Sequence, residues 1–332
     1  MPALITKGGN MRGFMSRVCI AAVVLFVGAA QAETGETSVL KWRDGKRAVF
    51  LLAFDDSCQS HVKNAIPELA KRGMVGTFYI NPGNGPFQSL RKVWESELPK
   101  NSAVVYGNHT FKHTGATNTA HLDLELAQCD TVIRKCYPER KQPCLVSFGR
   151  PGGVPWTVSD EEKKAALAKY NLIERPSFYG YPIHIKTTEA LCKLVDTALA
   201  KGEMVHHDFH GVGGDWLVTP MEAFNALLDK LDACRAEVWV TDHITYHKYL
   251  TERSSAQVKI ITADNVTIRL ALSSAADPRL YDTPLTLETR VPAGWTTCQI
   301  VQGEVTSECA VTDGKARFAA VPGAAEVVLT QR

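Results

Sequence analysis

Ala48-Val49-Phe50-Leu51-Leu52-Ala53-Phe54-Asp55-Asp56 is an apolar stretch that ends in two adjacent aspartates. A short apolar run of this kind is typical of a strand that is buried on both faces. Adjacent carboxylates at the end of such a strand repel one another and lose hydration, so their charge has to be neutralised. The stretch therefore predicts a buried strand with a charged site at its carboxyl end.

Two histidines follow further along the chain, in His109-Thr110-Phe111-Lys112-His113. Imidazoles four residues apart can share one face of a helix, where they could hold a divalent metal together with one aspartate. The other aspartate would then be available as a base beside a water molecule that the metal acidifies. The same spacing also occurs at His206/His210 and His243/His247. The first pair is distinguished by the two aspartates upstream.

Short apolar runs alternate with amphipathic stretches from residue 48 to about residue 250, which predicts a parallel sheet with helical crossovers. The predicted strands are Ala48–Phe54, Gly76–Ile80, Ala103–Val105, Leu145–Phe148, Leu172–Glu174, Glu203–Phe209 and Val238–Val240. The predicted helices are Val62–Arg72, His121–Lys135, Ser159–Tyr170, Thr188–Ala200 and Pro220–Ala233. Seven strands in one series favour a barrel.

The pattern changes after Arg253. Polar and apolar residues alternate in stretches such as Val266-Thr267-Ile268-Arg269-Leu270, helical periodicity is absent, and Gly, Pro, Asp and Ser punctuate the segment. This pattern predicts a small all-β sandwich at residues 254–332, after a barrel at residues 33–253. Such a domain could bind glycan, or it could pack against the barrel or act as a spacer.

Residues 1–32 have the pattern of a secretory signal peptide. The apolar run Val18–Ala30 is too short for a comfortable membrane span, and Ala30-Gln31-Ala32 suits cleavage. Removal of the three basic residues in this segment takes the net charge from +2 to −1. A near-neutral surface gives no reason to expect a nucleic-acid partner. We expect a periplasmic or extracellular protein with no membrane span after cleavage.

Eight cysteines follow the predicted signal peptide, and an even number in an exported chain suggests disulfides. Cys298 and Cys309 flank a hairpin-like segment, which predicts a bond between them. Cys192 lies within one predicted helix and Cys234 directly follows another, and both could instead be buried thiols. No set of cysteines has the paired C-x-x-C spacing of a structural zinc site.

At four places the sequence resembles the polysaccharide deacetylases, the NodB-homology enzymes of carbohydrate esterase family 4. The resemblance covers roughly residues 45–253, and its motifs read Phe54-Asp55-Asp56, His109-Thr110-Phe111-Lys112-His113, Phe148-Gly149-Arg150-Pro151-Gly152-Gly153 and Val205-His206-His207-Asp208-Phe209-His210. The family's Asp-x-x-Asp-Trp segment has no counterpart between the third and fourth motifs. The nearest polar stretch there, Glu174-Arg175-Pro176, matches it poorly.

The resemblance implies a distorted (β/α) barrel with its site at the carboxyl ends of the strands. It also implies one divalent ion, usually Zn²⁺, held by Asp56, His109 and His113. Asp55 would be the base that takes a proton from water, and Arg150 would orient Asp55. We therefore expect Asp55 and Arg150 to serve catalysis, while the other three bind metal.

His210 is the expected general acid. On an extended strand His206, Asp208 and His210 share one face, whereas His207 faces away. His206 and His207 remain alternatives, and Asp208 could orient a histidine in place of the missing segment. Two tryptophans in loops after predicted strands could stack on a sugar ring or pack beneath their loops; they are Trp156 and Trp216.

These features predict an exported, metal-dependent hydrolase that removes acetyl groups from an acetylated polysaccharide or oligosaccharide. One alternative is a catalytically inactive saccharide-binding barrel, which the missing segment makes credible. The other is a non-haem Fe(II) oxygenase, whose two-histidine, one-carboxylate site would not need Asp55. The sequence does not distinguish amide from ester acetyl groups, or one glycan from another.

Overall fold

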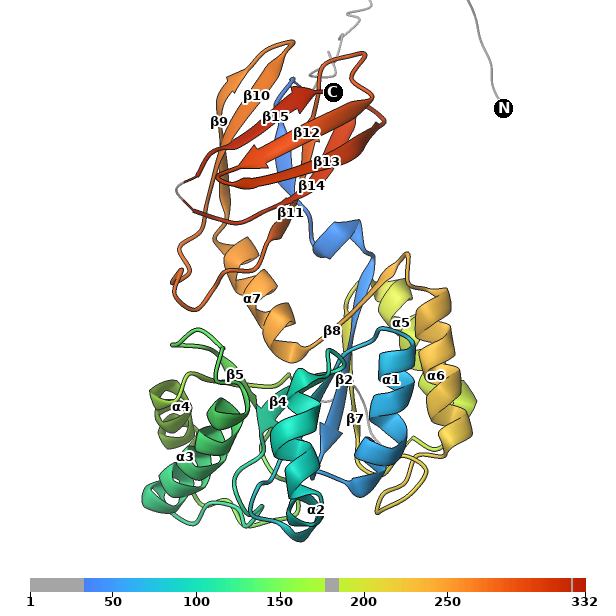
Figure 1. Ribbon diagram of the computed structural model, residues 1–332, viewed down its shortest axis with the longest axis vertical. Coiled ribbons are helices and arrows are strands. Elements are labelled where there is room, and N and C mark those ends of the chain that lie inside the picture. The colour runs from blue at the N-terminus through green and yellow to red at the C-terminus, as the bar shows by residue number, and fades with distance from the viewer. Residues whose placement is uncertain (1–32, 177–184, 324) are drawn as a thin grey trace, which may run out of the picture. The chain divides into compact units, whose positions relative to one another are not determined.

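The computed structural model describes residues 33–176, 185–323 and 325–332, so the predicted signal peptide lies outside the described residues (Figure 1). The first sheet consists of β2 (Ala48–Asp55), β3 (Gly76–Ile80), β4 (Val104–Asn108), β5 (Val146–Phe148), β6 (Leu172–Glu174), β7 (Met204–Phe209) and β8 (Val238–Thr241). Its helices are α1 (Ile66–Lys71), α2 (Gly85–Ser89), α3 (Thr119–Cys136), α4 (Asp160–Lys169), α5 (Thr188–Lys201), α6 (Met221–Ala233) and α7 (His243–Ser254). All seven predicted strands are present.

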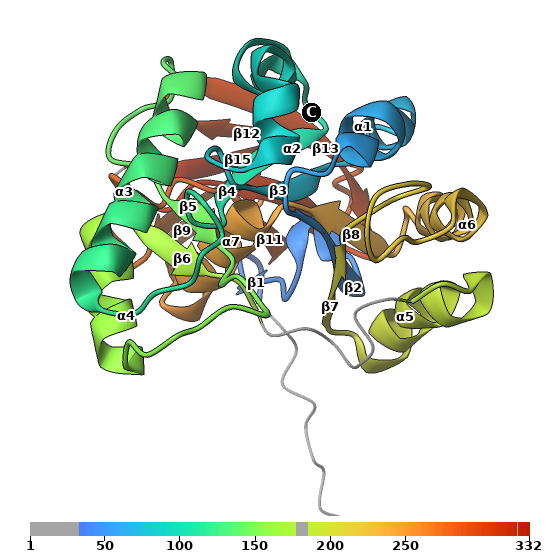
Figure 2. The same ribbon diagram turned by 90° about the horizontal axis from the view of Figure 1, so that it is seen from below.

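The first sheet is parallel and has the order β6-β5-β4-β3-β2-β7. Strand β8 pairs with the first half of β2, whereas β3 pairs with its carboxyl end. Among the described residues no ladder joins β6 to β7. Helices α1 to α6 lie around the outside of the strands (Figure 2). The expected distorted (β/α) barrel is therefore confirmed, and within the described residues its sheet is open between β6 and β7.

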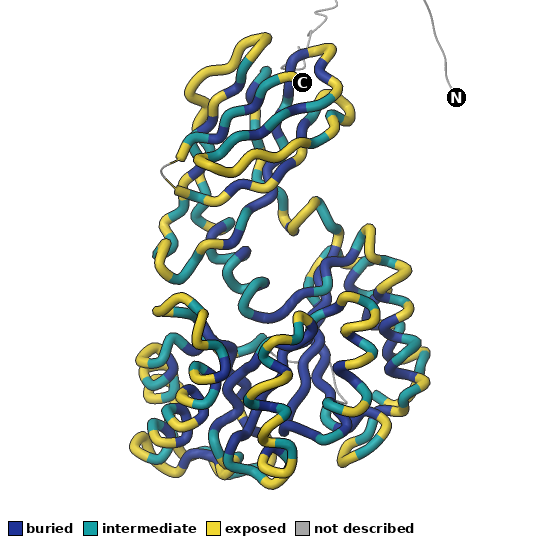
Figure 3. Tube along the Cα trace, in the orientation of Figure 1, coloured by how far each residue is buried: buried dark blue, intermediate teal, exposed yellow. Residues whose placement is uncertain are grey.

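Strand β2 is buried on both faces, as its continuous apolar sequence predicts (Figure 3). Phe50, Leu52 and Phe54 belong to the core beneath the helices. Val49 and Leu51 belong to a second cluster on the other face. Since side chains alternate along a strand, Asp55 continues the second face, toward the inside of the barrel.

The inside of the barrel is polar. Tyr79, Ser147 and His206 are 2% exposed or less. The hydroxyls of Tyr79 and Ser147 lie 2.8 Å apart, and Ser147 Oγ lies 2.6 Å from Nδ1 of His243, the first residue of α7. Buried polar groups need hydrogen-bond partners, and this network supplies them beneath the site.

Two of the predicted helix starts can be compared with the structure. Ser159 forms a capping box with Glu162 at the start of α4, where three acidic residues occupy the first turn. Pro220, predicted as the first helical residue of α6, lies one position before the helix and makes no side-chain cap. Both helices are confirmed, and α6 begins one residue late.

The second sheet is antiparallel, with the order β1-β11-β14-β13-β12-β15-β10-β9. Its strands are β1 (Thr37–Val39), β9 (Gln257–Ala263), β10 (Thr267–Ser273), β11 (Leu285–Arg290), β12 (Thr297–Gln302), β13 (Val305–Thr312), β14 (Lys315–Ala320) and β15 (Val327–Gln331). Ile268, Leu270 and Leu272 alternate into its core. The predicted β domain is therefore present. None of the described helices is long and apolar enough to cross a membrane.

The structure differs from two of the expectations about this part of the chain. Strand β1 pairs with β11, so residues 37–39 belong to the second sheet rather than to the barrel region expected at residues 33–253. A three-residue strand is too short to show a period in the sequence. Cys298 and Cys309 lie opposite one another in the β12–β13 ladder, but both are free thiols. The predicted disulfide is absent, and backbone hydrogen bonds hold this hairpin in register.

Candidate active site

A strained turn at the end of β2 brings both aspartates to one site. Asp56 and Ser57 have φ angles of 70° and 53°, a region that costs free energy for residues other than glycine. In a regular strand adjacent side chains would point to opposite faces. Here Nε2 of His109 lies 3.7 Å from Oδ2 of Asp55 and 3.4 Å from Oδ1 of Asp56.

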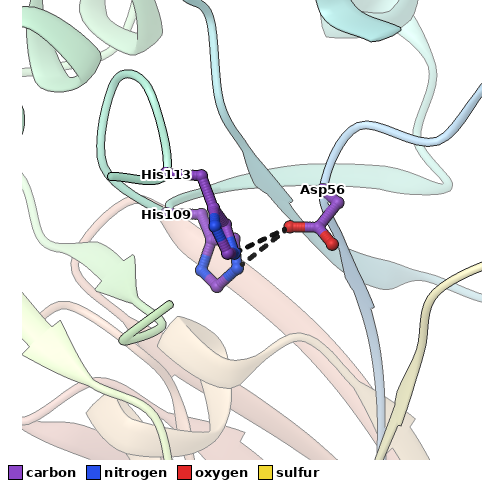
Figure 4. Close-up of side chains that lie close together, drawn as sticks. All are labelled: Asp56, His109 and His113. Carbon is purple, nitrogen blue, oxygen red and sulfur yellow. Dashed lines mark ion pairs between the residues drawn. The ribbon is translucent and has the colours of Figure 1, made fainter. Parts of the chain in front are cut away.

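His109 and His113 meet through a loop rather than along the face of a helix. The segment follows β4, and Thr110 and His113 have φ angles of 63° and 60°. Nε2 of His113 lies 3.2 Å from Oδ1 of Asp56, and both imidazoles point toward that carboxylate (Figure 4). The expectation of a shared helical face was wrong, although the two rings are adjacent, with centroids 5.1 Å apart.

Two buried side chains hold this loop in place. The amide nitrogen of Asn81 donates to the carbonyls of His109 and Thr110. Oε2 of Glu125 accepts a hydrogen bond of 2.7 Å from the backbone N–H of Lys112. These bonds replace the backbone ladder of a helix. Sequence analysis missed both residues, although Asn81 directly follows an apolar strand as the recognised motifs do.

The geometry around Asp56 suits a divalent metal. Nδ1 of His109 lies 2.7 Å from the carbonyl of Gly149, and a carbonyl only accepts, so Nδ1 carries the hydrogen. In its neutral form His109 directs the lone pair of Nε2 toward Asp56, as a metal ligand requires. Oδ1 of Asp56 is buried and accepts no hydrogen bond among the described residues. Ligand atoms of Asp56, His109 and His113 lie within 4.8 Å of one another. This donor set fits zinc.

The loop after β7 covers the other oxygen of Asp56. The indole N–H of Trp216 donates to Oδ2 of Asp56 at 3.1 Å, and Nε2 of His210 lies 3.6 Å from the same oxygen. Trp216 remains 41% exposed. The structure thus brings His210 and Trp216 to the same carboxylate as the two predicted metal-ligating histidines.

The segment after Asp56 anchors this loop. Ser60 donates its backbone N–H to Oδ2 of Asp215 at 2.7 Å and accepts from the N–H of Val212 at 3.1 Å. Nε2 of His61 lies 2.6 Å from the carbonyl of His210. Burial lowers the pKa of His61 to about 4, so this imidazole is neutral at pH 7 and donates its Nε2 hydrogen. Ser60 lies four residues after Asp56, so the segment that carries the aspartates also anchors the loop that carries His210.

Arg175, not Arg150, is the arginine that holds Asp55. Its two terminal nitrogens donate to Oδ1 and Oδ2 of Asp55 at 2.6 and 2.9 Å. Arg150 is exposed, and its guanidinium lies 4.8 Å from the ring centre of Trp156. The prediction for Arg150 was wrong because sequence similarity cannot show which arginine reaches across the barrel. Arg175 directly follows β6, and that position was the available signal.

Trp156 packs beneath its own loop, one of the two alternatives left open by the sequence. Its indole N–H donates to the carbonyl of Pro151 at 3.0 Å, and the side chain is only partly exposed. The face of its ring is occupied by Arg150. Of the two predicted sugar-stacking tryptophans, only Trp216 contacts the group of residues around Asp56.

Both aspartates are ionised at neutral pH despite their burial. Burial raises the pKa of Asp55, but the positive charge of Arg175 outweighs it and holds that pKa well below its usual range. For Asp56 burial also raises the pKa, and the adjacent His109 lowers it by more, so this pKa lies below its usual value. The adjacent carboxylates are thus neutralised by different partners, as their position at the end of a buried strand requires.

Asp208 and His206 lie behind Arg175. Oδ2 of Asp208 is 3.0 Å from Nη1 of Arg175, and Oδ1 is 3.0 Å from Nε2 of His206. His207 lies on the opposite face of β7, where its ring centre is 4.6 Å from that of Phe209. The strand therefore has the alternation that its extended form predicts.

No protein-family description matches this chain, and no curated protein sequence matches it. Among solved structures, a family 4 carbohydrate esterase from Streptomyces lividans in complex with acetate is similar over 58% of this chain and 92% of that one, with 15% identity and a TM-score of 0.38. A peptidoglycan N-acetylglucosamine deacetylase is similar over 58% and 85%, with 14% identity and a TM-score of 0.43. A pseudoenzyme of the same esterase family from Bacillus anthracis is similar over 58% and 63%, with 15% identity and a TM-score of 0.41.

Proposed function

We propose that this chain is a metal-dependent hydrolase that removes acetyl groups from an acetylated polysaccharide or oligosaccharide. The observation that carries the proposal is that two adjacent carboxylates have different partners. Asp56 faces two imidazole nitrogens, whereas Asp55 is held by an arginine. Zn²⁺ held by Asp56, His109 and His113 would acidify a water molecule and polarise an acyl carbonyl.

Asp55 suits the role of base. Arg175 fixes both of its oxygens, and Oδ2 of Asp55 is still only 3.7 Å from Nε2 of His109. The carboxylate therefore borders the metal-ligating atoms without belonging to the cluster. An ionised carboxylate in this position can accept a proton from the attacking water.

His210 suits the role of acid. It lies on the Oδ2 side of Asp56, across that carboxylate from His109 and His113, and the bond from His61 fixes its backbone. From there it can give a proton to the departing amine or alcohol. Beside it, Asp56 fixes the indole of Trp216, whose exposed face offers a stacking surface for a sugar ring.

Export accords with this proposal. The signal-like pattern of residues 1–32 supports a periplasmic or extracellular location, where a polysaccharide substrate would be met. We propose an acetylated glycan as the partner of the site and one divalent ion as its cofactor.

The test is acetate release from a panel of acetylated glycans: chitin-type oligosaccharides, peptidoglycan and O-acetylated xylan. We expect release from at least one of them, loss of activity with a chelator, and recovery when Zn²⁺ is added back. Glycan binding without acetate release at saturating Zn²⁺ would identify an inactive saccharide-binding barrel. Oxygen consumption that needs Fe(II) and a 2-oxo acid would identify an oxygenase instead.

A further inference from the structure

We propose that Asp208 is a positioning residue for the base: it holds Arg175 in the orientation in which Arg175 grips both oxygens of Asp55. This inference rests on the proposed function, because it assigns a task within that reaction. It concerns a buried carboxylate that touches neither the metal-ligating atoms nor any surface that substrate could reach; its side chain is 0% exposed.

Arg175 is bound on two edges by two carboxylates. Its Nη1 lies 2.6 Å from Oδ1 of Asp55 and 3.0 Å from Oδ2 of Asp208. Its Nη2 donates to the remaining oxygen of Asp55 at 2.9 Å. The contact with Asp208 is an ion pair, because neither oxygen of Asp208 has a hydrogen-bond partner among the described residues. The buried negative charge of Asp208 therefore attracts the guanidinium from a second side and favours the orientation in which it faces Asp55.

Two further contacts complete the support. The guanidinium of Arg175 lies over the ring of Tyr79, 4.4 Å from its centre, which limits movement out of the plane. Nε2 of His206 lies 3.0 Å from Oδ1 of Asp208, so the second carboxylate also has a close neighbour of its own. Outer contacts of this kind help to orient a functional side chain.

The position of these residues in the barrel explains why an extra support is needed. Asp55 and Asp208 lie on the paired strands β2 and β7, whereas Arg175 follows β6. Among the described residues no ladder joins β6 to β7. The contact between Arg175 and Asp208 spans this gap, and it ties the arginine to the strand pair that carries the base.

The test compares Asp208→Asn with the unchanged protein in steady-state acetate release. Asn keeps the size of the side chain but removes its charge, so we expect kcat to fall about tenfold or more while KM and bound metal stay unchanged. In an Arg175→Gln background the same substitution should cost nothing further, because residues that act as a unit are not additive. His207→Gln is the matched control on the opposite face of β7, and it should keep kcat.

Three results would overturn the inference. They are full kcat in Asp208→Asn, a loss confined to KM, or losses that multiply in the double variant with Arg175→Gln. If Asp208→Asn does not fold, Asp208→Glu keeps the charge but displaces it, and it should lower kcat with KM retained; full kcat there would also overturn the inference. An unchanged protein that releases no acetate from any glycan would remove the proposed function itself, which is a different outcome.

Discussion

At the scale of single residues, the site separates two neighbours that are identical in chemistry. Asp56 turns out of the strand with a φ of 70° and meets imidazoles, whereas Asp55 stays in the strand and meets a guanidinium. Strained φ values in non-glycine residues persist only where surrounding contacts impose them. The two carboxylates should therefore respond differently to substitution.

The first prediction separates these carboxylates. Asp56→Ala removes a proposed ligand, so metal content and acetate release should fall together, and excess Zn²⁺ should restore part of both. Asp55→Asn keeps the shape but cannot take a proton, so metal should stay bound while turnover falls about 10²–10⁴-fold. Elemental analysis beside acetate release checks both. Metal loss in Asp55→Asn, with metal retained in Asp56→Ala, would reverse the assignment.

The second prediction concerns the acid. His210→Ala should lower turnover at least about a hundredfold while stoichiometric metal is retained, because His210 is placed to donate a proton and is not one of the three proposed ligands. His207→Ala serves as the control, since that ring packs on the opposite face of the strand. Acetate release and metal content are measured for both. If the control lost turnover and His210→Ala did not, the acid would be misassigned.

At the scale of elements, loops and short turns carry the site while the strands provide the frame. The segment from His109 to His113 is held by Asn81 and Glu125, and the loop after β7 is held by Ser60 and His61. These anchors are buried polar side chains that bond to backbone groups, which is how irregular segments are satisfied inside a protein. Another buried polar side chain, Glu252 in α7, should make the free energy of unfolding depend on pH.

The third prediction concerns Glu252 in α7, which is 2% exposed and accepts a hydrogen bond of 3.0 Å from the N–H of Thr283. Burial raises its pKa from 4.5 to about 7, helped by Asp282 and opposed by that N–H and Lys248. The folded state thus holds this proton more tightly than the unfolded state does. The contribution of Glu252 to stability is complete below pH 4.5 and is lost as pH rises through about 7.

Urea denaturation at a series of pH values checks this sign. The free energy of unfolding should fall as pH rises across that window, and Glu252→Gln, which stays neutral, should flatten this part of the curve. Glu326→Gln is the control, because that side chain is an exposed partner of Arg269. An unchanged slope in Glu252→Gln would show that this carboxyl does not titrate there.

At the scale of the whole molecule, the chain between residues 33 and 332 does not divide cleanly at residue 253. Strand β1 precedes the barrel but pairs with β11 of the second sheet. Leu285 of β11 belongs to the same buried cluster as Trp42, Tyr246 and Tyr249. The hydroxyl of Tyr249 also donates to the carbonyl of Leu40 at 2.9 Å. Unfolding of one part should therefore affect the other.

The fourth prediction tests this coupling with Leu285→Ala. Leu285 is 0% exposed, so its truncation should lower the free energy of unfolding by about 2–5 kcal/mol. A single urea transition seen both by circular dichroism and by tryptophan fluorescence should move to lower urea. Val305→Ala, at a β13 position that is 70% exposed, should stay within about 0.5 kcal/mol of the unchanged protein. Two separate transitions would contradict the coupling.

The sequence by itself determined the barrel strands, and its resemblance to a known family pointed to Asp55, Asp56, His109, His113 and His210. Each strand and each motif lies within one contiguous segment, and the carboxyl ends of parallel strands meet at one edge of a sheet, so local patterns suffice to predict that the motifs lie close together. The same reasoning located the β domain, since alternation is also a local signal.

Only the tertiary structure decided that Arg175 rather than Arg150 holds Asp55, that Trp216 bonds to Asp56, and that β1 joins the second sheet. Each of these contacts joins residues more than a hundred positions apart in the chain. Which residues meet depends on the direction of their side chains across a barrel in which no ladder among the described residues joins β6 to β7. The distances between side chains across the barrel depend on how all the strands pack together. They therefore cannot be predicted from a local period or from the spacing of residues in the sequence.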